Sequence, residues 1–233
     1  MTTPTGFAVA IDGPAGVGKS TTARRVAESL GMTYIDTGSM YRAIALYCVR
    51  HGIDLQDKAA VSTNLPNIQI YLTQGQIYLN DEDVSGAIRT QAISDATSII
   101  APYPAVREKL SAKQKEIAAT GQVVMDGRDI GSHVLPWAQV KIYLDADPGI
   151  RAARRAAELA EKGQQTDISQ IRKEIELRDH RDKTREHSPL VKANDAVCID
   201  TGHMTKDEVV ASIIAHIKAA RRKQCSIDSL EGC

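Results

Sequence analysis

The chain has 233 residues, a length typical of one domain, and 42% of them are hydrophobic although only 4% are aromatic. Lysine plus arginine equal aspartate plus glutamate at 29 each, and this zero net charge excludes a protein that coats nucleic acid or a membrane through overall positive charge. Because the sequence shows neither a signal peptide nor an apolar run of the ~20 residues that span a membrane, and its four cysteines form no C-x-x-C pair, we expect a cytoplasmic protein with reduced thiols.

The start of the chain has the pattern of a strand, a loop and a helix. The apolar run from Phe7 to Asp12 is typical of a strand buried on both faces of a parallel sheet. A glycine-rich loop follows, and then a helix is predicted from Ser20 to Leu30, where Gly31 ends it. A short strand at 32–36 and a helix from 39 to before Gly52 continue this alternation, which indicates an α/β fold.

The middle of the chain has a different pattern. Apolar residues alternate with polar ones over 67–80, around a turn at Gln74 and Gly75, which predicts an antiparallel hairpin. Two helices are predicted next, at about 86–100 and 104–120, because the prolines of the intervening segment end the first and start the second. We therefore expect a small inserted subdomain here.

The α/β pattern then resumes. Strands are predicted at 122–126, 140–145 and 196–200, with helices at 148–163 and 205–223, and the last ten residues are predicted to form an unstructured tail. With the two early strands, this order predicts a five-stranded parallel sheet with right-handed crossovers.

The loop GPAGVGKS, from Gly13 to Ser20, fits the pattern G-x-x-x-x-G-K-[ST] at every position. In this motif backbone N–H groups surround phosphates, the lysine reaches the terminal phosphates and the hydroxyl meets Mg²⁺. A chance glycine-rich turn is the alternative, but the loop also follows a buried strand and opens a helix, whose N-terminal end favours anions. We therefore expect Lys19 to bind phosphate.

The segment VVMDGRD places Asp126, Arg128 and Asp129 at the carboxyl end of a predicted strand. Ligands of open α/β sheets gather at this edge, and a carboxylate beside a triphosphate can hold Mg²⁺ through water. The alternative for Asp126 is a simple turn aspartate. The planar guanidinium of Arg128 suits a second phosphate.

A predicted helix that begins after Asp167 has one face whose chemistry changes along its length. Six residues at spacings of three and four share this face: Ile168, Ile171, Ile175, Arg178, Asp182 and Arg185. Such a face either emerges into solvent as an Arg–Asp pair or lines a cleft that contains charge, because unpaired buried charge is costly. On the preceding helix, Arg151, Arg154 and Arg155 are interpreted, taken alone, as a solvated face.

Five strings in this order carry a resemblance to a known family: the glycine-rich loop, DTGSMYR, DVSGAIRT, VMDGRDIG and RDHRDKTREHSPL. On them the sequence resembles the bacterial cytidylate kinases, of the nucleoside monophosphate kinase family, from about Phe7 to Arg222. The resemblance implies a single P-loop kinase domain over 1–223, of three α/β/α layers, and a tail at 224–233. Within the domain it implies a core at about 7–63, 101–153 and 179–223, a monophosphate-binding insert at about 64–100 and a mobile helical lid at about 154–178.

The resemblance also implies a reaction, in which a monomer transfers the γ-phosphoryl group of ATP to CMP or dCMP with Mg²⁺. The implied ATP-binding residues are Gly13, Pro14, Ala15, Gly16, Val17, Gly18, Lys19, Ser20, Thr21 and Arg154. The implied CMP-binding residues are Thr37, Arg42, Ser98, Arg107, Arg128, Asp129, Arg178, Asp182 and Arg185. Ser20 would hold Mg²⁺ directly and Asp126 through water. The catalytic group would be Lys19, Arg128, Arg185 and Asp126.

The resemblance also implies a division of roles, which agrees with the chemistry of cytosine, because its amino group beside ring acceptors suits one carboxylate and one guanidinium. Base recognition would fall to Ser98, Arg107 and Asp129, sugar recognition to Arg178 and Asp182, and phosphate binding to Arg42, Arg128 and Arg185. The sequence departs from the family pattern at His133 and Trp137, which puts the shape of the base pocket in question.

Three alternatives remain open at this point. A kinase for a different small acceptor would share the loop and the arginine-rich cleft. A nucleotide-dependent switch would bind ATP or GTP without an acceptor, but the sequence lacks the N-K-x-D motif of common GTPases. A regulatory module would need a partner-binding surface, and no exposed apolar stripe indicates one.

Overall fold

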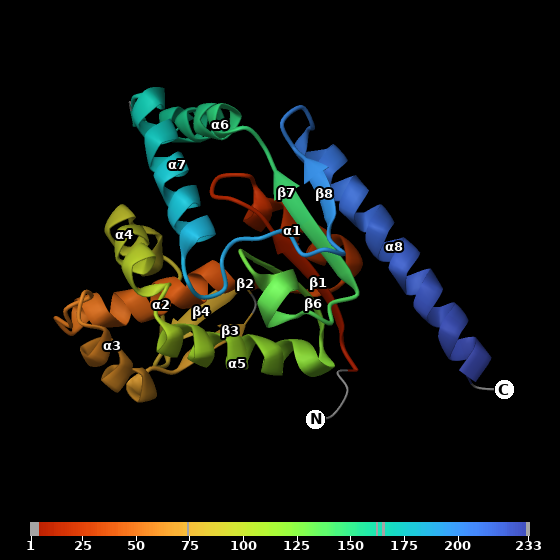
Figure 1. Cartoon of the computed structure of the whole chain (residues 1–233), viewed down its shortest axis with the longest axis horizontal. Helices are drawn as coiled ribbons and strands as arrows, with labels where there is room; N and C mark the ends of the chain where they lie inside the picture. The colour runs from red at the N-terminus through yellow and green to blue at the C-terminus, as the bar shows by residue number, and fades with distance from the viewer. Residues whose placement is uncertain (1–4, 74, 162, 165, 232–233) are drawn as a thin grey trace.

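Five parallel strands form the main sheet in the order β2-β6-β1-β7-β8 (Figure 1), in a computed structural model that describes residues 5–73, 75–161, 163–164 and 166–231. The strands are β1 (Phe7–Asp12), β2 (Thr33–Asp36), β6 (Gln122–Gly127), β7 (Val140–Asp145) and β8 (Val197–Asp200). All neighbouring pairs are parallel. Because β1 is central and all six of its residues are buried, its sequence is apolar throughout.

Helices cover both faces of this sheet, which confirms the three-layer α/β/α prediction. On one face, Val9 and Ile11 of β1 pack in a cluster with α1 (Lys19–Leu30) and α8 (Lys206–Glu231). On the other face, the small side chains of Ala8 and Ala10 pack in a cluster that includes Ala118 of α5 (Pro104–Thr120). The period-two alternation along β1 thus sorts its side chains between two apolar layers.

A second, antiparallel sheet is formed by β3 (Ile70–Thr73), β4 (Gln76–Leu79) and β5 (Glu82–Asp83), which confirms the predicted hairpin. Gly75 of the predicted turn has a φ of 78°, which favours glycine, and Gln74 lies outside the described residues. This sheet packs around α2 (Thr37–Arg50), together with α3 (Lys58–Asn64) and α4 (Gln91–Ile100).

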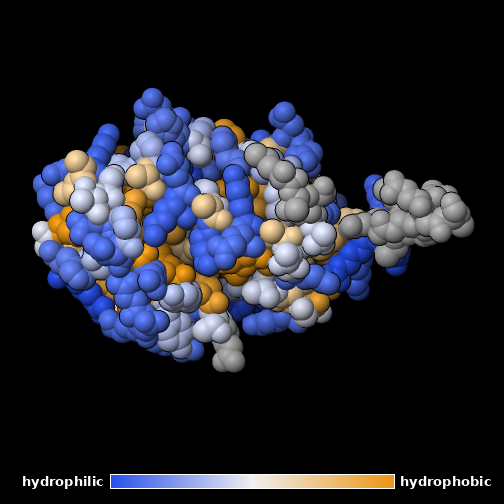
Figure 2. All heavy atoms as spheres, turned by 90° about the horizontal axis from the view of Figure 1, so that it is seen from below, coloured by the Kyte–Doolittle hydropathy of each residue, from blue (hydrophilic) through white to orange (hydrophobic). Residues whose placement is uncertain are grey.

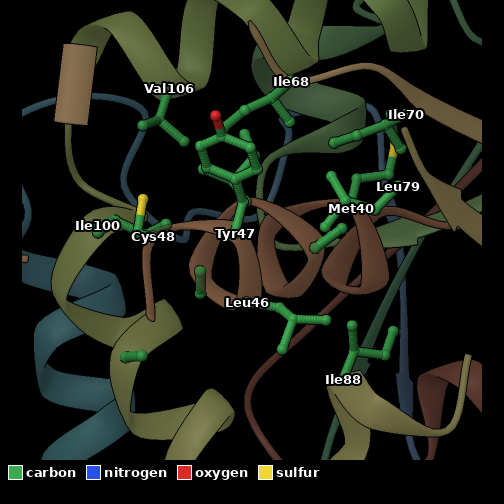
Figure 3. Close-up of a cluster of buried hydrophobic side chains, with 14 of the residues drawn as sticks. Met40, Leu46, Tyr47, Cys48, Ile68, Ile70, Leu79, Ile88, Ile100 and Val106 are labelled. Carbon is green, nitrogen blue, oxygen red and sulfur yellow. The ribbon is translucent and has the colours of Figure 1, made fainter. Parts of the chain in front are cut away.

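The apolar cluster around α2 is shown in Figure 3. Met40 and Tyr47 of α2 lie there beside Ile70 and Leu79 of the small sheet and Ile100 of α4. The predicted insert is therefore built on a helix that precedes it in the sequence, and its boundary at residue 64 stays a prediction.

The helices α6 (Pro148–Glu161) and α7 (Ile168–Thr184) pack against each other beyond the carboxyl end of β7 (Figure 1). They share a small apolar cluster of their own, made by Ala152, Ile171 and Ile175. Ile171 and Ile175 are two of the residues that the helical periodicity of the sequence placed on one face, whereas Ile168 of that predicted face is 52% exposed and does not belong to the cluster.

The structure corrects two predicted boundaries. The helix expected from residue 86 begins at Gln91, because the side chain of Thr90 accepts the N–H of Ile93 and caps it there. The tail expected to be unstructured from residue 224 continues α8 through Glu231, since no glycine or proline interrupts 203–231. Gly232 and Cys233 lie outside the described residues.

On the face seen in Figure 2, hydrophilic side chains cover most of the surface, and apolar ones show mainly in the recesses between them. Within the described part of the chain, none of the helices combines the length and the apolar character that crossing a membrane would require.

Candidate active site

The glycine-rich loop lies between β1 and α1, as the motif predicts. Gly13 has a φ of 151°, and a Cβ at this position would collide with the carbonyl oxygen of Leu144 on β7, so only glycine fits. Lys19 is buried, and its Nζ donates to the carbonyl oxygen of Pro14 over 2.7 Å. Burial, aided by the nearby charge of Arg128, lowers the pKa of Lys19 well below its usual value.

Asp126, at the carboxyl end of β6, accepts hydrogen bonds from side chains of three elements. The hydroxyl of Ser20 donates to one carboxylate oxygen and the hydroxyl of Tyr34 to the other, each over 2.9 Å. Thr37 donates to the backbone carbonyl of Asp126 over 2.6 Å. Burial, with the neighbouring charge of Asp36, raises the pKa of Asp126 to about 6.

Ser20 and Asp126 therefore lie together beside the loop, as the sequence predicts. A hydroxyl and a carboxylate oxygen are hard ligands, which suit a Mg²⁺ ion that keeps several waters and binds substrate phosphates. The donor set at this position fits the metal that the motif implies.

A buried cluster of ion pairs joins residues that lie far apart in the sequence. Asp129 binds Arg107 through one carboxylate oxygen and Arg185, 3.2 Å away, through the other. Arg128 donates from its Nε to Asp182 of α7 over 2.8 Å. The charged end of the predicted helix face is thus half-buried and paired with residues of other elements, so it is not a fully solvated helix end.

The cluster carries an excess of positive charge near the loop. Burial, together with the charge of Arg128, lowers the pKa of Arg178 to about 10. Burial alone would raise the pKa of Asp182, but Arg128 and Arg178 outweigh it and the pKa ends below its usual value. Arg42 pairs with Asp36 over 3.2 Å.

Two arginines of this cluster have donors without a partner. The Nε atoms of Arg42 and Arg107 are buried and have no hydrogen-bond partner among the described residues. Because an unsatisfied buried donor costs about 1–3 kcal/mol, such atoms indicate a place where a ligand supplies the acceptor.

Two residues that the family resemblance assigned to the substrates, Ser98 and Arg154, bind backbone carbonyls in the structure, which the sequence does not indicate. Ser98 donates to the carbonyl of Ser94 within α4, over 3.1 Å. Arg154 donates to the carbonyl of Thr201, over 2.6 Å, in the segment between β8 and α8. Both lie at least half-buried, so neither belongs to a fully solvated face.

The interpretation of Arg151 as part of a solvated face is wrong. Only 3% of its side chain is exposed, because α6 turns it inward against Asp179 of α7, which lies 2.7 Å away. Arg155, in contrast, is exposed and pairs with Glu158 on its own helix.

Sequence reasoning missed several residues of the site. The sequence around Tyr34 does not indicate a polar role, since an aromatic residue in a short strand usually packs in the apolar core. Asp12 ends β1 and accepts the N–H groups of Ile130 and Gly131 over 2.9 and 2.7 Å, and burial raises its pKa to about 6. Asp179 follows Ile175 by four residues, and that helical spacing could have found it.

The two departures from the family pattern differ in their relation to the site, because the backbone N–H of His133 donates to the carbonyl of Asp129 over 2.9 Å, whereas Trp137 lies in an apolar environment. His133 is exposed, and its Nδ1 lies 2.8 Å from the hydroxyl of Ser132. Trp137 packs against the apolar cluster beneath β6.

Residues 9–219 match the family model described as cytidylate kinase. The chain belongs to the cytidylate kinase family. A cytidylate kinase of Lactiplantibacillus plantarum is 47% identical over 222 residues, which cover 94% of this chain and 96% of that protein. A cytidylate kinase of Pelotomaculum thermopropionicum is 47% identical over 220 residues, which cover 92% of this chain and 97% of that protein. The chain is therefore an enzyme of the nucleotide kinase class.

Among solved structures, a gluconokinase from Sinorhizobium meliloti 1021 is similar at 15% identity with a TM-score of 0.48, covering 97% of this chain and 99% of that one. The cytidylate kinase family match, by contrast, spans both the phosphate-binding loop and the Arg–Asp cluster.

Proposed function

We propose that this enzyme transfers the γ-phosphoryl group of ATP to CMP or dCMP, with Mg²⁺, giving ADP and the diphosphate. The observation that carries the proposal is that two regions rich in positive charge or backbone N–H groups meet at one edge of the sheet. The loop that ends in Lys19 is one of them, and the buried cluster around Arg128 is the other. Their charges influence each other directly, since Arg128 lowers the pKa of Lys19.

In this proposal the loop from Gly13 to Thr21 binds the phosphates of ATP through its backbone N–H groups. Ser20 holds Mg²⁺ directly and Asp126 holds it through water, which the 2.9 Å separation of their oxygens supports. The metal supplies charge neutralisation for the phosphate oxygens. Arg154 lies near the segment after β8 and would border the nucleoside of ATP.

The buried ion-pair cluster would hold CMP. Asp129 would accept the amino group of cytosine while Arg107 donates to its ring, and uracil would present a carbonyl where Asp129 needs a donor. Arg178 and Asp182 would bind the sugar, with Arg42, Arg128 and Arg185 on the phosphate. The unpartnered Nε atoms of Arg42 and Arg107 support this assignment, because a nucleotide offers acceptors to both.

Catalysis would then depend on position and charge. The phosphate of CMP is already an anion near neutral pH, so its oxygen attacks without a strong base, and the chain must bring two anions into line. Lys19, Arg128 and Arg185 offset their repulsion. Closure of the predicted insert and lid would exclude water, which could otherwise accept the phosphoryl group.

A coupled assay of ADP production, with ATP, Mg²⁺ and a panel of monophosphates, tests the proposal. We expect CMP and dCMP to give turnover far above that with UMP, AMP, GMP or no acceptor. Turnover with another acceptor in preference to CMP, or hydrolysis of ATP that no acceptor stimulates, would refute it. The Lys19→Ala variant serves as the blank for contaminating kinases.

A further inference from the structure

The tip of the phosphate-binding loop is held by a buried ion pair from α6 and α7. The N–H of Ala15 donates to Asp179 over 3.0 Å, and its carbonyl accepts from Arg151 over 2.7 Å. Arg151 and Asp179 also bind each other over 2.7 Å. The backbone N–H and the backbone carbonyl of Ala15 are thus both bound by the same pair of side chains.

This contact is largely buried. The side chains of Arg151 and Asp179 are only 3% and 9% exposed. Arg151 also donates from its Nε to the carbonyl of Ala146, just after β7, over 2.9 Å. Because a buried charge without its partner is strongly destabilising, these groups hold one fixed geometry.

Close packing also holds the loop at Gly16, next to the ion pair. A Cβ on Gly16 would lie 3.7 Å from both the Cβ of Arg151 and the Cδ1 of Ile175. The loop therefore lies directly against both helices, one residue beyond the ion pair. The ion pair and this close packing together join the two helices to the loop.

The same part of α7 carries two of the residues proposed to bind CMP. Arg178 and Asp182 flank Asp179 within one turn of the helix, and Asp182 binds Arg128 over 2.8 Å. A single helix of 17 residues thus contacts the ATP loop through Asp179 and the proposed CMP site through its neighbours. A displacement of the loop tip must displace α7 or break the buried pair.

We propose that Arg151 and Asp179 are positioning residues that couple the two substrate sites through α7, so that binding of ATP raises the affinity for CMP, and the reverse. The inference rests on the proposed function for the identity of the second ligand. Such coupling is reciprocal by thermodynamic necessity, and factors of about 5–150 are typical.

The test measures the Kd of CMP by calorimetry, with and without a non-hydrolysable ATP analogue and Mg²⁺. For the unaltered chain we expect the analogue to lower the Kd at least about fivefold. In Asp179→Asn, which keeps an acceptor for Ala15 but loses the ion pair, and in Arg151→Lys, which loses the forked donor, we expect a change below about twofold.

Glu176→Gln is the matched control. Glu176 lies one turn earlier on α7, is exposed and pairs with Arg172 of the same helix over 2.8 Å. It should keep the coupling factor of the unaltered chain. Thermal unfolding of each variant separates lost coupling from lost stability, because a merely structural pair would lower the melting temperature and leave the coupling factor in place.

A coupling factor of one in the unaltered chain, or the full factor in both variants, would overturn the inference. If the variants do not fold, hydrogen exchange of the unaltered chain decides, since the ATP analogue alone should slow exchange across 168–184, and unchanged exchange there refutes the link. Failure of CMP to bind refutes the proposed function instead, and the exchange measurement still tests the contact between the loop and α7.

Discussion

Removal of the Asp129 carboxylate should have a large effect on stability. In Asp129→Ala, Arg107 and Arg185 keep side chains that are each only 6% exposed but lose their shared counter-ion. Breaking a buried ion pair by removing one partner costs about 3–5 kcal/mol. At about 3 °C per kcal/mol for a chain of this size, the melting temperature should fall by roughly 10 °C.

The same variant should lose base selectivity. Asp129 is proposed to accept the cytosine amino group, and a hydrogen bond to a charged group is worth about 1.5–3 kcal/mol. The ratio of kcat/KM for CMP to that for UMP should therefore fall by about 10- to 100-fold. Steady-state assays of both acceptors and thermal unfolding by circular dichroism, at one salt concentration, measure the two effects.

The control is Asp207→Ala, which removes the partner of Arg25 in an ion pair where the Asp207 side chain is 80% exposed. Exposed pairs contribute about 0–1 kcal/mol, so its melting temperature and base selectivity should stay near those of the unaltered chain. If Asp129→Ala melts no lower than this control, the reasoning about uncompensated arginines is wrong. An unchanged CMP to UMP ratio would remove Asp129 from base recognition.

Three further predictions concern the loop and its surroundings. Lys19→Ala and Arg128→Ala should each lower CMP-dependent turnover by orders of magnitude while circular dichroism stays unchanged, and near-normal turnover in a folded Arg128→Ala would contradict its role. Because burial raises the pKa of Asp126 from 3.8 to about 6, its contribution to the free energy of unfolding is greatest below pH 3.8 and is lost as the pH rises through about 6. In urea denaturation, Asp126→Asn should therefore have a higher free energy of unfolding than the unaltered chain at pH 7.5, and this difference should shrink toward pH 4. An equal difference at pH 7.5 and pH 4 would contradict the raised pKa of Asp126. Gly13→Ala should abolish binding of ATP in calorimetry, since the added methyl collides with Leu144, and retained affinity would show that the loop tolerates a shift.

The features that depend on local pattern could be predicted from the sequence. The buried strands, the loop and most of the inward face of α7 each follow from spacing within one segment, although Ile168 of that predicted face is exposed. Which side chains meet across segments could not be predicted in the same way. Arg151 looked solvated on α6 because its partner, Asp179, lies on another helix, and the pairing depends on how the two helices pack.

The same limit applies to Asp12 and Tyr34. Each ends or lies within a strand whose local pattern is satisfied by burial alone, so nothing nearby indicates a hydrogen bond to residues more than 90 positions away. Polar contacts of this kind are determined by the order of strands in the sheet, which the sequence constrains only through general connection rules.

The division of the apolar interior has a consequence for how this enzyme can change. Among the described residues, the buried members of the cluster around α2 differ from those of the clusters on the main sheet, but the half-buried Leu72 packs against both this cluster and the one that contains Ala8 and Ala10. Substitutions at distant sites without shared partners have additive effects on stability. Mutations around α2 that leave Leu72 and Thr37 unchanged can therefore accumulate with little effect on the loop proposed to bind phosphate, so the proposed acceptor site can diverge during evolution while the proposed donor site stays the same.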